Sequence, residues 1–187
     1  MIVTLSGITG IGKSFYKNVI SDELGFKNMV IVTTRQKRTG EVNGIDKEFV
    51  SLEEFEKLKK QGIIKYDFEF LGNRYGYKTD DLDSFENQVT ELHYSTIYDF
   101  KKNALSKVFS IYLVPANYED AKMHLKKRGL PKEVEEKRLK EIEEHIKEYS
   151  NNEMLQKQFD LVFTNNYDEK SKNELLNILK DNIYIKN

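Results

Sequence analysis

Residues 7–14 read Gly7-Ile8-Thr9-Gly10-Ile11-Gly12-Lys13-Ser14, which matches the pattern G-x-x-x-x-G-K-[ST] in full. The apolar run Ile2-Val3-Thr4-Leu5 precedes this stretch, and a helical pattern follows it to about Leu24. Glycines let the backbone curl so that successive N–H groups point inward and bind an anion. The order of strand, glycine-rich loop and helix therefore predicts a site for the phosphates of a nucleoside triphosphate.

Two side chains of this loop have specific expected roles. Lys13 can reach the β- and γ-phosphates of ATP, and the Ser14 hydroxyl can ligate Mg²⁺. The positive end of the following helix adds to the attraction for phosphate. The sequence thus predicts ATP and Mg²⁺ as required small molecules. The expected ATP-binding residues in the loop are Gly7, Gly10, Ile11, Gly12, Lys13 and Ser14.

Composition narrows the class of protein. The chain has 187 residues, a formal net charge of -1 and no cysteine. Its length suits one α/β domain with an insertion, and its balanced charge gives no overall cationic field for nucleic acid or an anionic membrane. The lack of cysteine excludes disulfides and thiolate chemistry, and no run approaches the ~20 apolar residues of a membrane span. We expect a cytoplasmic enzyme, monomeric or homodimeric, that acts on a small nucleotide.

Short apolar runs alternate with helical patterns along most of the chain, which predicts a parallel sheet with helices on both faces. Residues 40–80 interrupt this alternation with short strands and turns, so we interpret them as part of an inserted lobe. The expected core strands are Ile2–Leu5, Met29–Val32, Val89–Leu92, Val108–Val114 and Leu161–Thr164, and the expected lobe strands include Ile63–Tyr66 and Phe68–Leu71.

Arginine is scarce in this chain. Of 30 basic residues, the arginines are Arg35, Arg38, Arg74, Arg128 and Arg138. Guanidinium is a planar fork suited to bidentate contact with phosphate, whereas the lysine ammonium is a point charge. The five arginines are therefore candidate phosphate ligands.

The segment Thr33-Thr34-Arg35-Gln36-Lys37-Arg38-Thr39-Gly40-Glu41-Val42-Asn43-Gly44-Ile45-Asp46, followed by Phe49-Val50-Ser51 and Glu54-Phe55, resembles the guanylate kinase family. That family shows T-T-R-x-P-R-x-G-E-x-x-G-x-D-Y-x-F-V-S-x-x-E-F here, and Gly72-Asn73-Arg74-Tyr75-Gly76 resembles its G-N-x-Y-G. Lys127-Arg128-Gly129 and Lys137-Arg138-Leu139 resemble the two arginine positions of its lid. Phe159–Asn165 resembles its last strand, which ends in an asparagine near the adenine.

The resemblance implies an α/β fold of the P-loop nucleoside triphosphate hydrolase type, with a five-stranded parallel sheet flanked by helices. It implies a single domain over residues 1–187, with a core of 1–32 and 81–187, an acceptor-binding lobe of 33–80 and a helical lid at about 126–145. The implied reaction is ATP-dependent phosphoryl transfer to the 5′-phosphate of a nucleoside monophosphate, with GMP or dGMP as the default acceptor. The implied roles are catalysis for Lys13, Arg128 and Arg138, ATP binding for Asn165, and acceptor-phosphate binding for Arg35, Arg38 and Tyr75.

Departures from the family pattern gather at the acceptor site. Lys37 replaces a proline, and Lys47 replaces an aromatic residue but could still serve a phosphate as a point charge. The family reads guanine with acidic side chains, because a carboxylate accepts from N1–H and the 2-amino group together. The positions expected to be serine, glutamate, serine or threonine, and aspartate are here Ile31, Tyr66, Tyr77 and His93. We therefore expect an altered base preference.

Several alternatives stay open at this stage. Asp67, Glu69 or Glu91 could restore a carboxylate after a small shift in register, and His93 could be an ordinary hydrogen-bonded core histidine. Glu91 also occupies the family's place for an acidic residue near the metal, which implies a contact to Mg²⁺ through water.

Two other functions are also open. One is a kinase of another phosphorylated acceptor, such as a ribose phosphate. The other is a non-catalytic guanylate-kinase-like binding module, although the intact Gly-Lys-Ser and the lid arginines argue against a module.

Overall fold

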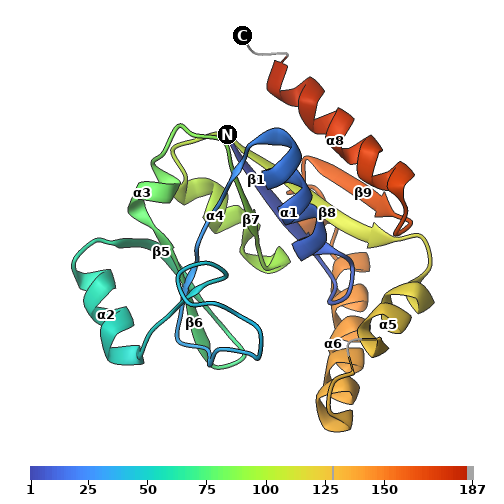
Figure 1. The fold of residues 1–187 in the computed structure, drawn as a ribbon, viewed down its shortest axis with the longest axis horizontal. Helices are drawn as coiled ribbons and strands as arrows, with labels where there is room; N and C mark the ends of the chain where they lie inside the picture. Colours follow the sequence, from blue (N-terminus) through green and yellow to red (C-terminus); the bar gives the residue numbers. More distant parts are fainter. Residues whose placement is uncertain (128, 185–187) are drawn as a thin grey trace.

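The first strand lies at the centre of the main sheet (Figure 1). In this computed structural model, which describes residues 1–127 and 129–184, β1 (Ile2–Gly7) pairs with β7 on one side and β8 on the other. The sheet has the order β2-β7-β1-β8-β9, and every pairing in it is parallel. Its remaining strands are β2 (Lys27–Asn28), β7 (Gln88–Glu91), β8 (Val108–Pro115) and β9 (Leu161–Asn165). The predicted five-stranded parallel sheet is confirmed.

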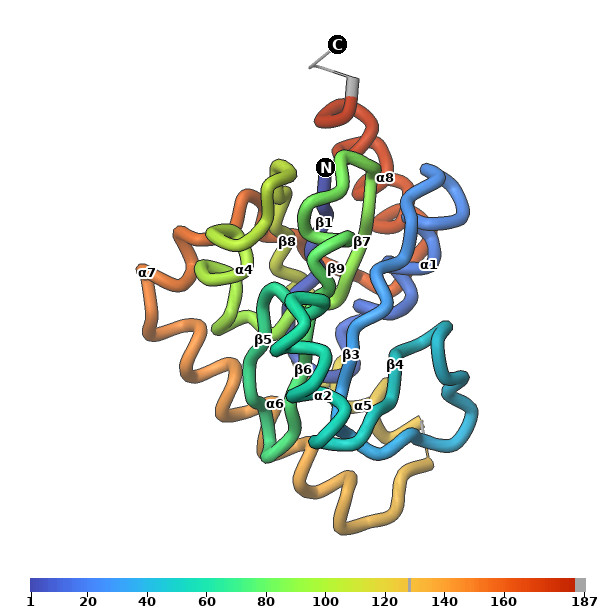
Figure 2. The backbone as a smooth tube through the Cα atoms, turned by 90° about the vertical axis from the view of Figure 1, so that its left-hand side faces the viewer, coloured from blue at the N-terminus to red at the C-terminus, as the bar shows by residue number. Residues whose placement is uncertain are grey.

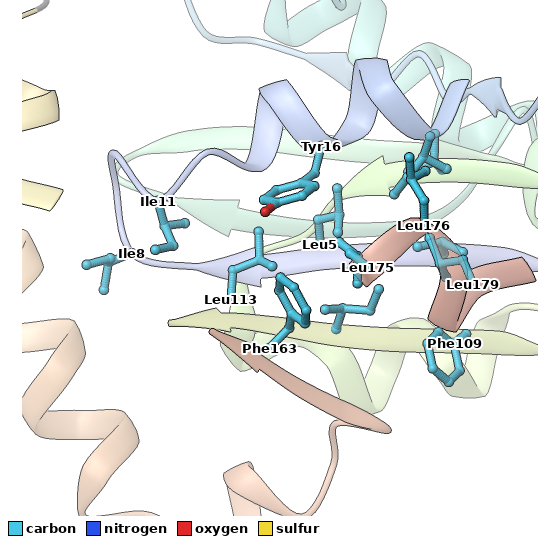
Figure 3. Close-up of a cluster of buried hydrophobic side chains, with 14 of the residues drawn as sticks. Leu5, Ile8, Ile11, Tyr16, Phe109, Leu113, Phe163, Leu175, Leu176 and Leu179 are labelled. Carbon is cyan, nitrogen blue, oxygen red and sulfur yellow. The ribbon is translucent and has the colours of Figure 1, made fainter. Parts of the chain in front are cut away.

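Both faces of this sheet are buried, which explains why its strands read as nearly continuous apolar runs. Alternate residues of β1 enter different hydrophobic clusters, with Val3 and Leu5 on one face and Ile2 on the other. Figure 3 shows part of the first cluster, where Tyr16 of α1 (Lys13–Leu24) lies over Leu5. The helix α8 (Glu169–Tyr184) completes that cluster with Leu175, Leu176 and Leu179.

Helix α4 (Ile97–Asn103) packs on the opposite face, and its Ile97 and Phe100 belong to the second cluster. The remaining helices are α2 (Leu52–Lys60), α3 (Thr79–Leu82), α5 (Tyr118–Lys126), α6 (Lys132–Ser150) and α7 (Glu153–Gln156), with a 3₁₀ turn at Tyr94–Thr96. No helix among the described residues is long and apolar enough to cross a membrane.

A second sheet interrupts the alternation of strands and helices. Its order is β4-β3-β6-β5, built from β3 (Val32–Thr33), β4 (Glu48–Phe49), β5 (Ile64–Phe70) and β6 (Asn73–Lys78). The antiparallel pair β5–β6 turns at Leu71 and Gly72, with φ angles of 51° and 70°. Positive φ at both central residues matches the right-handed twist of a hairpin. Both views place β5, β6 and α6 in the lower half of the molecule, beyond the strands of the main sheet (Figures 1 and 2).

Three expected strands differ from the structure. The run Met29–Val32 does not form one strand, because the chain passes from the main sheet to the second sheet there. Lys27–Asn28 pairs with β7, whereas Val32–Thr33 pairs with β4 and β6. Conversely, the two short strands expected at 63–71 form the single strand β5, with a register shift between Ile64 and Tyr66.

Phe55 anchors α2 on the second sheet, so its truncation tests how that sheet is held. Its side chain is fully buried against Val32 and Ile64. We expect Phe55→Ala to lower the free energy of unfolding by ~3–5 kcal/mol, because it leaves a cavity. Leu52→Ala on the same helix is the matched control, since Leu52 is 59% exposed and surface changes usually stay within ~0.5 kcal/mol. Urea denaturation measures both, and equal effects would contradict the packing described.

Candidate active site

The loop after β1 is shaped by glycines that no other residue could replace without strain. Gly7 has φ +138°, and a Cβ there would lie 2.5 Å from the carbonyl oxygen of Leu113 on β8. Gly12 caps α1 with φ 93°. These left-handed conformations are open to glycine and costly for other residues. The loop consequently packs tightly on the sheet and brings Lys13 and Ser14 into the first turn of α1.

Lys13 and Ser14 have defined partners on this loop and on β7. Lys13 Nζ donates to the carbonyl oxygens of Gly7 and Ile8, each at 2.9 Å. Ser14 Oγ donates to Glu91 Oε1 at 2.7 Å. The lysine ammonium therefore lies over the loop, and the serine hydroxyl lies beside a carboxylate.

Burial alone would raise the pKa of Glu91, but Lys13, the Ser14 hydroxyl and Lys47 together bring that pKa below its ordinary value. Glu91 is thus an ionised carboxylate next to a hydroxyl, and oxygen ligands of this kind suit Mg²⁺. Among the described residues, no group of three or more His, Cys, Asp or Glu side chains could hold a metal. A Mg²⁺ ion at Ser14 and Glu91 would depend on water and substrate phosphates for its other ligands.

Asn165 ties the end of β9 to the same loop. Its side chain is buried, and Nδ2 donates to the carbonyl oxygen of Ile11 at 2.8 Å. Its Oδ1 accepts from the Tyr16 hydroxyl at 3.0 Å and from the Tyr167 N–H at 2.8 Å. The residue expected near the adenine therefore contacts the phosphate-binding loop directly and fixes its backbone.

A cavity of about 580 Å³ lies in front of the loop, between the second sheet and α6. It brings together most of the residues expected at the site. Those that line it are Gly7, Gly10, Gly12, Lys13, Ser14, Arg38, Lys47, Tyr75, Tyr77, Glu91, His93 and Arg138, and Ile31 lines it as well. Ile11, Arg35, Tyr66 and Asn165 are absent from the lining.

Cationic side chains converge on this cavity from both sides. Burial is the main cause that lowers the pKa of Arg38, and repulsion from Arg35 and Arg138 lowers it further. Burial likewise lowers the pKa of Lys47, although Glu91 opposes that shift. Burial and mutual repulsion destabilise the charged forms of these groups, and an anion bound between them would stabilise those charged forms. The arrangement is therefore suited to a bound polyanion.

Arg35 has a supporting position behind this wall. Its Nη2 donates to both carboxylate oxygens of Glu41, at 2.7 and 3.0 Å, and its guanidinium lies 5.4 Å from the centre of the Phe49 ring. Glu41 also accepts from the backbone N–H of Arg38 at 2.8 Å. Arg35 thus organises the turn that carries Arg38.

Asp67 and Glu69 of β5, which could have replaced the guanine-reading carboxylate of the family, do not line the cavity. Asp67 pairs with Arg74 and, at 2.7 Å, with Lys59. Phe68 and Phe70 line the cavity, whereas Asp67 and Glu69 do not, as expected from the alternation of side chains along a strand. Of the three acidic candidates, the structure brings only Glu91 into the cavity.

Tyr66 and Tyr77 fill the core side of the site with aromatic rings. They are 8% and 2% exposed, and their rings stack with centroids 6.1 Å apart. The edge of Phe100 completes the packing 4.8 Å from the Tyr77 ring. The Tyr77 hydroxyl donates to the backbone oxygen of Glu91 at 3.0 Å, and burial raises the pKa of Tyr66 to about 12. Both side chains are therefore neutral and apolar over most of their surface.

His93 fits both of the alternatives that the sequence left open, because it is hydrogen-bonded like a core histidine and also lines the cavity. Its Nδ1 lies 2.8 Å from Ser95 Oγ, and its ring contacts Phe70 and Tyr94 at centroid distances of 4.3 and 4.4 Å. Burial lowers the pKa of His93 to about 4, so the ring is neutral near pH 7.

Sequence reasoning missed the face that α6 presents to the cavity. Its alternating Glu and Lys residues are typical of a helix that faces solvent. Residues spaced three or four apart nevertheless form one stripe along the cavity, namely Val134, Arg138, Glu141, His145 and Glu148. Arg138 Nη1 donates to Glu141 Oε2 at 2.6 Å within that stripe. The same spacing was visible in the sequence and was the one available signal. Arg128, the other expected lid arginine, lies outside the described residues.

The guanylate kinase family model matches residues 1–182. The guanylate kinase of Mycoplasma mobile is 33% identical over 98% of this chain and 94% of its own length. That of Streptococcus pneumoniae strain R6 is 33% identical over 78% of this chain and 73% of its own length. A crystal structure of guanylate kinase from Anaplasma phagocytophilum superposes with a TM-score of 0.71 at 24% identity, covering 97% of this chain and 85% of that one.

The parallel sheet, the phosphate-binding loop and these matches define a P-loop nucleoside monophosphate kinase. Within that class, the chain belongs to the guanylate kinase family.

Proposed function

We propose that this protein transfers the γ-phosphoryl group of ATP to the 5′-phosphate of a nucleoside monophosphate, with GMP or dGMP as the default acceptor. The observation that carries this proposal is that Lys13 and Ser14 line the same cavity as Arg38, Lys47 and Tyr75. Phosphoryl transfer requires two polyanions to be held in line while cationic groups neutralise the developing charge. One cavity with loop residues at one wall and cations at another supports such an arrangement.

The loop side would bind the donor. Backbone N–H groups of residues 7–14 and the Lys13 ammonium would hold the ATP phosphates. Mg²⁺, when bound at Ser14 and through water at Glu91, would supply further neutralisation of those phosphates. Asn165 keeps the loop in its binding shape through the Ile11 carbonyl.

The opposite side would bind the acceptor. Arg38, Lys47 and Tyr75 would hold the acceptor phosphate, with Arg35 placing the turn before Glu41. We assign residues 33–80 to acceptor binding, and the segment at about 126–145 to a lid that brings Arg138 toward the transferring group. Arg128 would act with Arg138 from the same lid.

We further propose that discrimination for guanine is weaker than in the family pattern. This second candidate is supported by Tyr77, which lines the cavity, and by Tyr66 stacked against it, at the positions where the family resemblance implies a hydroxyl and a carboxylate. Each guanine donor left unpaired on burial would cost ~1–3 kcal/mol, enough to let another base compete. ADP release measured with every nucleoside and deoxynucleoside monophosphate, and with ribose phosphates, tests both candidates. No transfer to any of them would favour the non-catalytic module instead.

Replacing Lys13 tests the donor side. We expect Lys13→Ala to lower kcat/KM for ATP by a factor equivalent to ~3–4 kcal/mol of lost transition-state stabilisation, because the ammonium that contacts the β- and γ-phosphates is removed. Lys180→Ala on the exposed side of α8 is the control and should behave as the unmodified protein. Turnover of Lys13→Ala close to that of the control would exclude the assignment.

Replacing Arg38 tests the acceptor side. We expect Arg38→Lys to raise the acceptor KM roughly tenfold or more, because a bidentate guanidinium contact becomes a point charge, with the KM for ATP little changed. Arg74→Lys is the matched control, because Arg74 pairs with Asp67 and Glu56 away from the cavity. A selective rise in the KM for ATP would instead place Arg38 on the donor side.

A further inference from the structure

The cavity continues past the acceptor-phosphate residues along α6, away from the rings of Tyr66 and Tyr77. On the core side the cavity is lined by Ile31 and by Tyr77, whose hydroxyl already donates to the Glu91 backbone oxygen. Further polar groups of the lining come from His93 and Tyr94, which follow β7, and from His145 and Glu148 of α6. These four side chains offer hydrogen-bonding groups to an acceptor base.

These four side chains form one connected group. The His145 ring stacks on Tyr94 with centroids 3.6 Å apart, and its Nε2 pairs with the Tyr112 hydroxyl at 2.8 Å. The Tyr94 hydroxyl donates to Glu148. Burial lowers the pKa of His145 to about 3, so this ring is neutral near pH 7. Because Nε2 of His145 and Nδ1 of His93 have protein partners, Nδ1 of His145 and Nε2 of His93 are the nitrogens that a ligand would meet.

Spacing along α6 limits what kind of acceptor could use this group. His145 and Glu148 follow Arg138 by seven and ten residues on the same face. At a rise of 1.5 Å per residue, these separations are about 10 and 15 Å. A molecule with its phosphate near Arg138 must therefore extend well beyond a sugar to contact them. A nucleotide has that length, whereas a ribose phosphate has no base to contact His145 and Glu148.

We propose that His145 and Glu148 of α6, together with His93, bind the edge of the acceptor base and determine specificity. A carboxylate only accepts hydrogen bonds, so Glu148 favours an exocyclic amino group with its two N–H donors over uracil or thymine, which offer only N3–H. Arg138 lies on the same helix, so base binding and placement of the lid arginine act on a single rigid element. This inference rests on the proposed function and names the acceptor class within it.

The test compares kcat/KM for GMP, AMP and CMP with that for UMP, dTMP and ribose 5-phosphate. We expect the unmodified protein to favour an amino-bearing base. Glu148→Gln still accepts from Tyr94 but loses the carboxylate, and His145→Phe keeps the ring but loses both nitrogens. Each should lower kcat/KM for the preferred nucleotide roughly tenfold or more and reduce its advantage over UMP, with the KM for ATP unchanged. Glu143→Gln is the control, because Glu143 is on the same helix but outside the cavity lining.

Contrary outcomes separate this inference from the proposed function. Transfer to no nucleoside monophosphate would overturn both. Active transfer with the same base ratios in Glu148→Gln, His145→Phe and the unmodified protein would overturn the inference alone. Ribose 5-phosphate used as well as a nucleotide would also overturn it. Thermal unfolding of each variant identifies a merely structural effect. Such an effect would lower the midpoint of unfolding and reduce kcat/KM for all acceptors by the same factor.

Discussion

The close contact of backbone with backbone at the end of β1 is the constraint on which the site depends. Gly7 approaches Leu113 of β8 so closely that no side chain fits between them, and Asn165 of β9 then holds the Ile11 carbonyl. Three neighbouring strands therefore fix the loop from below. Because the loop is fixed, the start of α1 at Lys13 is fixed as well. Ser14 is thereby placed to donate its hydrogen bond to Glu91 on β7, which lies on the other side of β1.

Charge balance is the second principle of the site. Arg38 and Arg138 repel each other across the cavity, and Arg35, behind its wall, repels both Arg38 and Lys47. Glu41 offsets Arg35 and Glu141 pairs with Arg138, so the unliganded protein keeps these cations close together at a tolerable cost. Preorganised cations of this kind stabilise charge in phosphoryl transfer without rearranging when the substrate arrives.

The sequence allowed the main sheet and the phosphate-binding loop to be predicted because both depend on local signals. Glycine positions and apolar runs are properties of short segments. The division at Met29–Val32 was missed because strand assignment there depends on hydrogen bonds to distant strands, β7 for Lys27–Asn28 and β6 for Val32–Thr33. Similarly, the sequence predicted a helical lid at about 126–145 but not which face of α6 meets a cavity. That face is defined by β5 and by Tyr94, which lie far away in sequence.

The packing of Tyr66 and Tyr77 has a consequence for how the molecule unfolds. These rings come from the second sheet, yet they belong to the same hydrophobic cluster as Phe100 of α4 and Tyr112 of the main sheet. An independently folding unit needs a core of its own, and the second sheet has only the small cluster of Val32, Phe55 and Ile64 to itself. Separating the sheets would expose these aromatic side chains to water at once. We therefore expect the two sheets to melt in a single cooperative transition, with no stable state in which only one of them is folded.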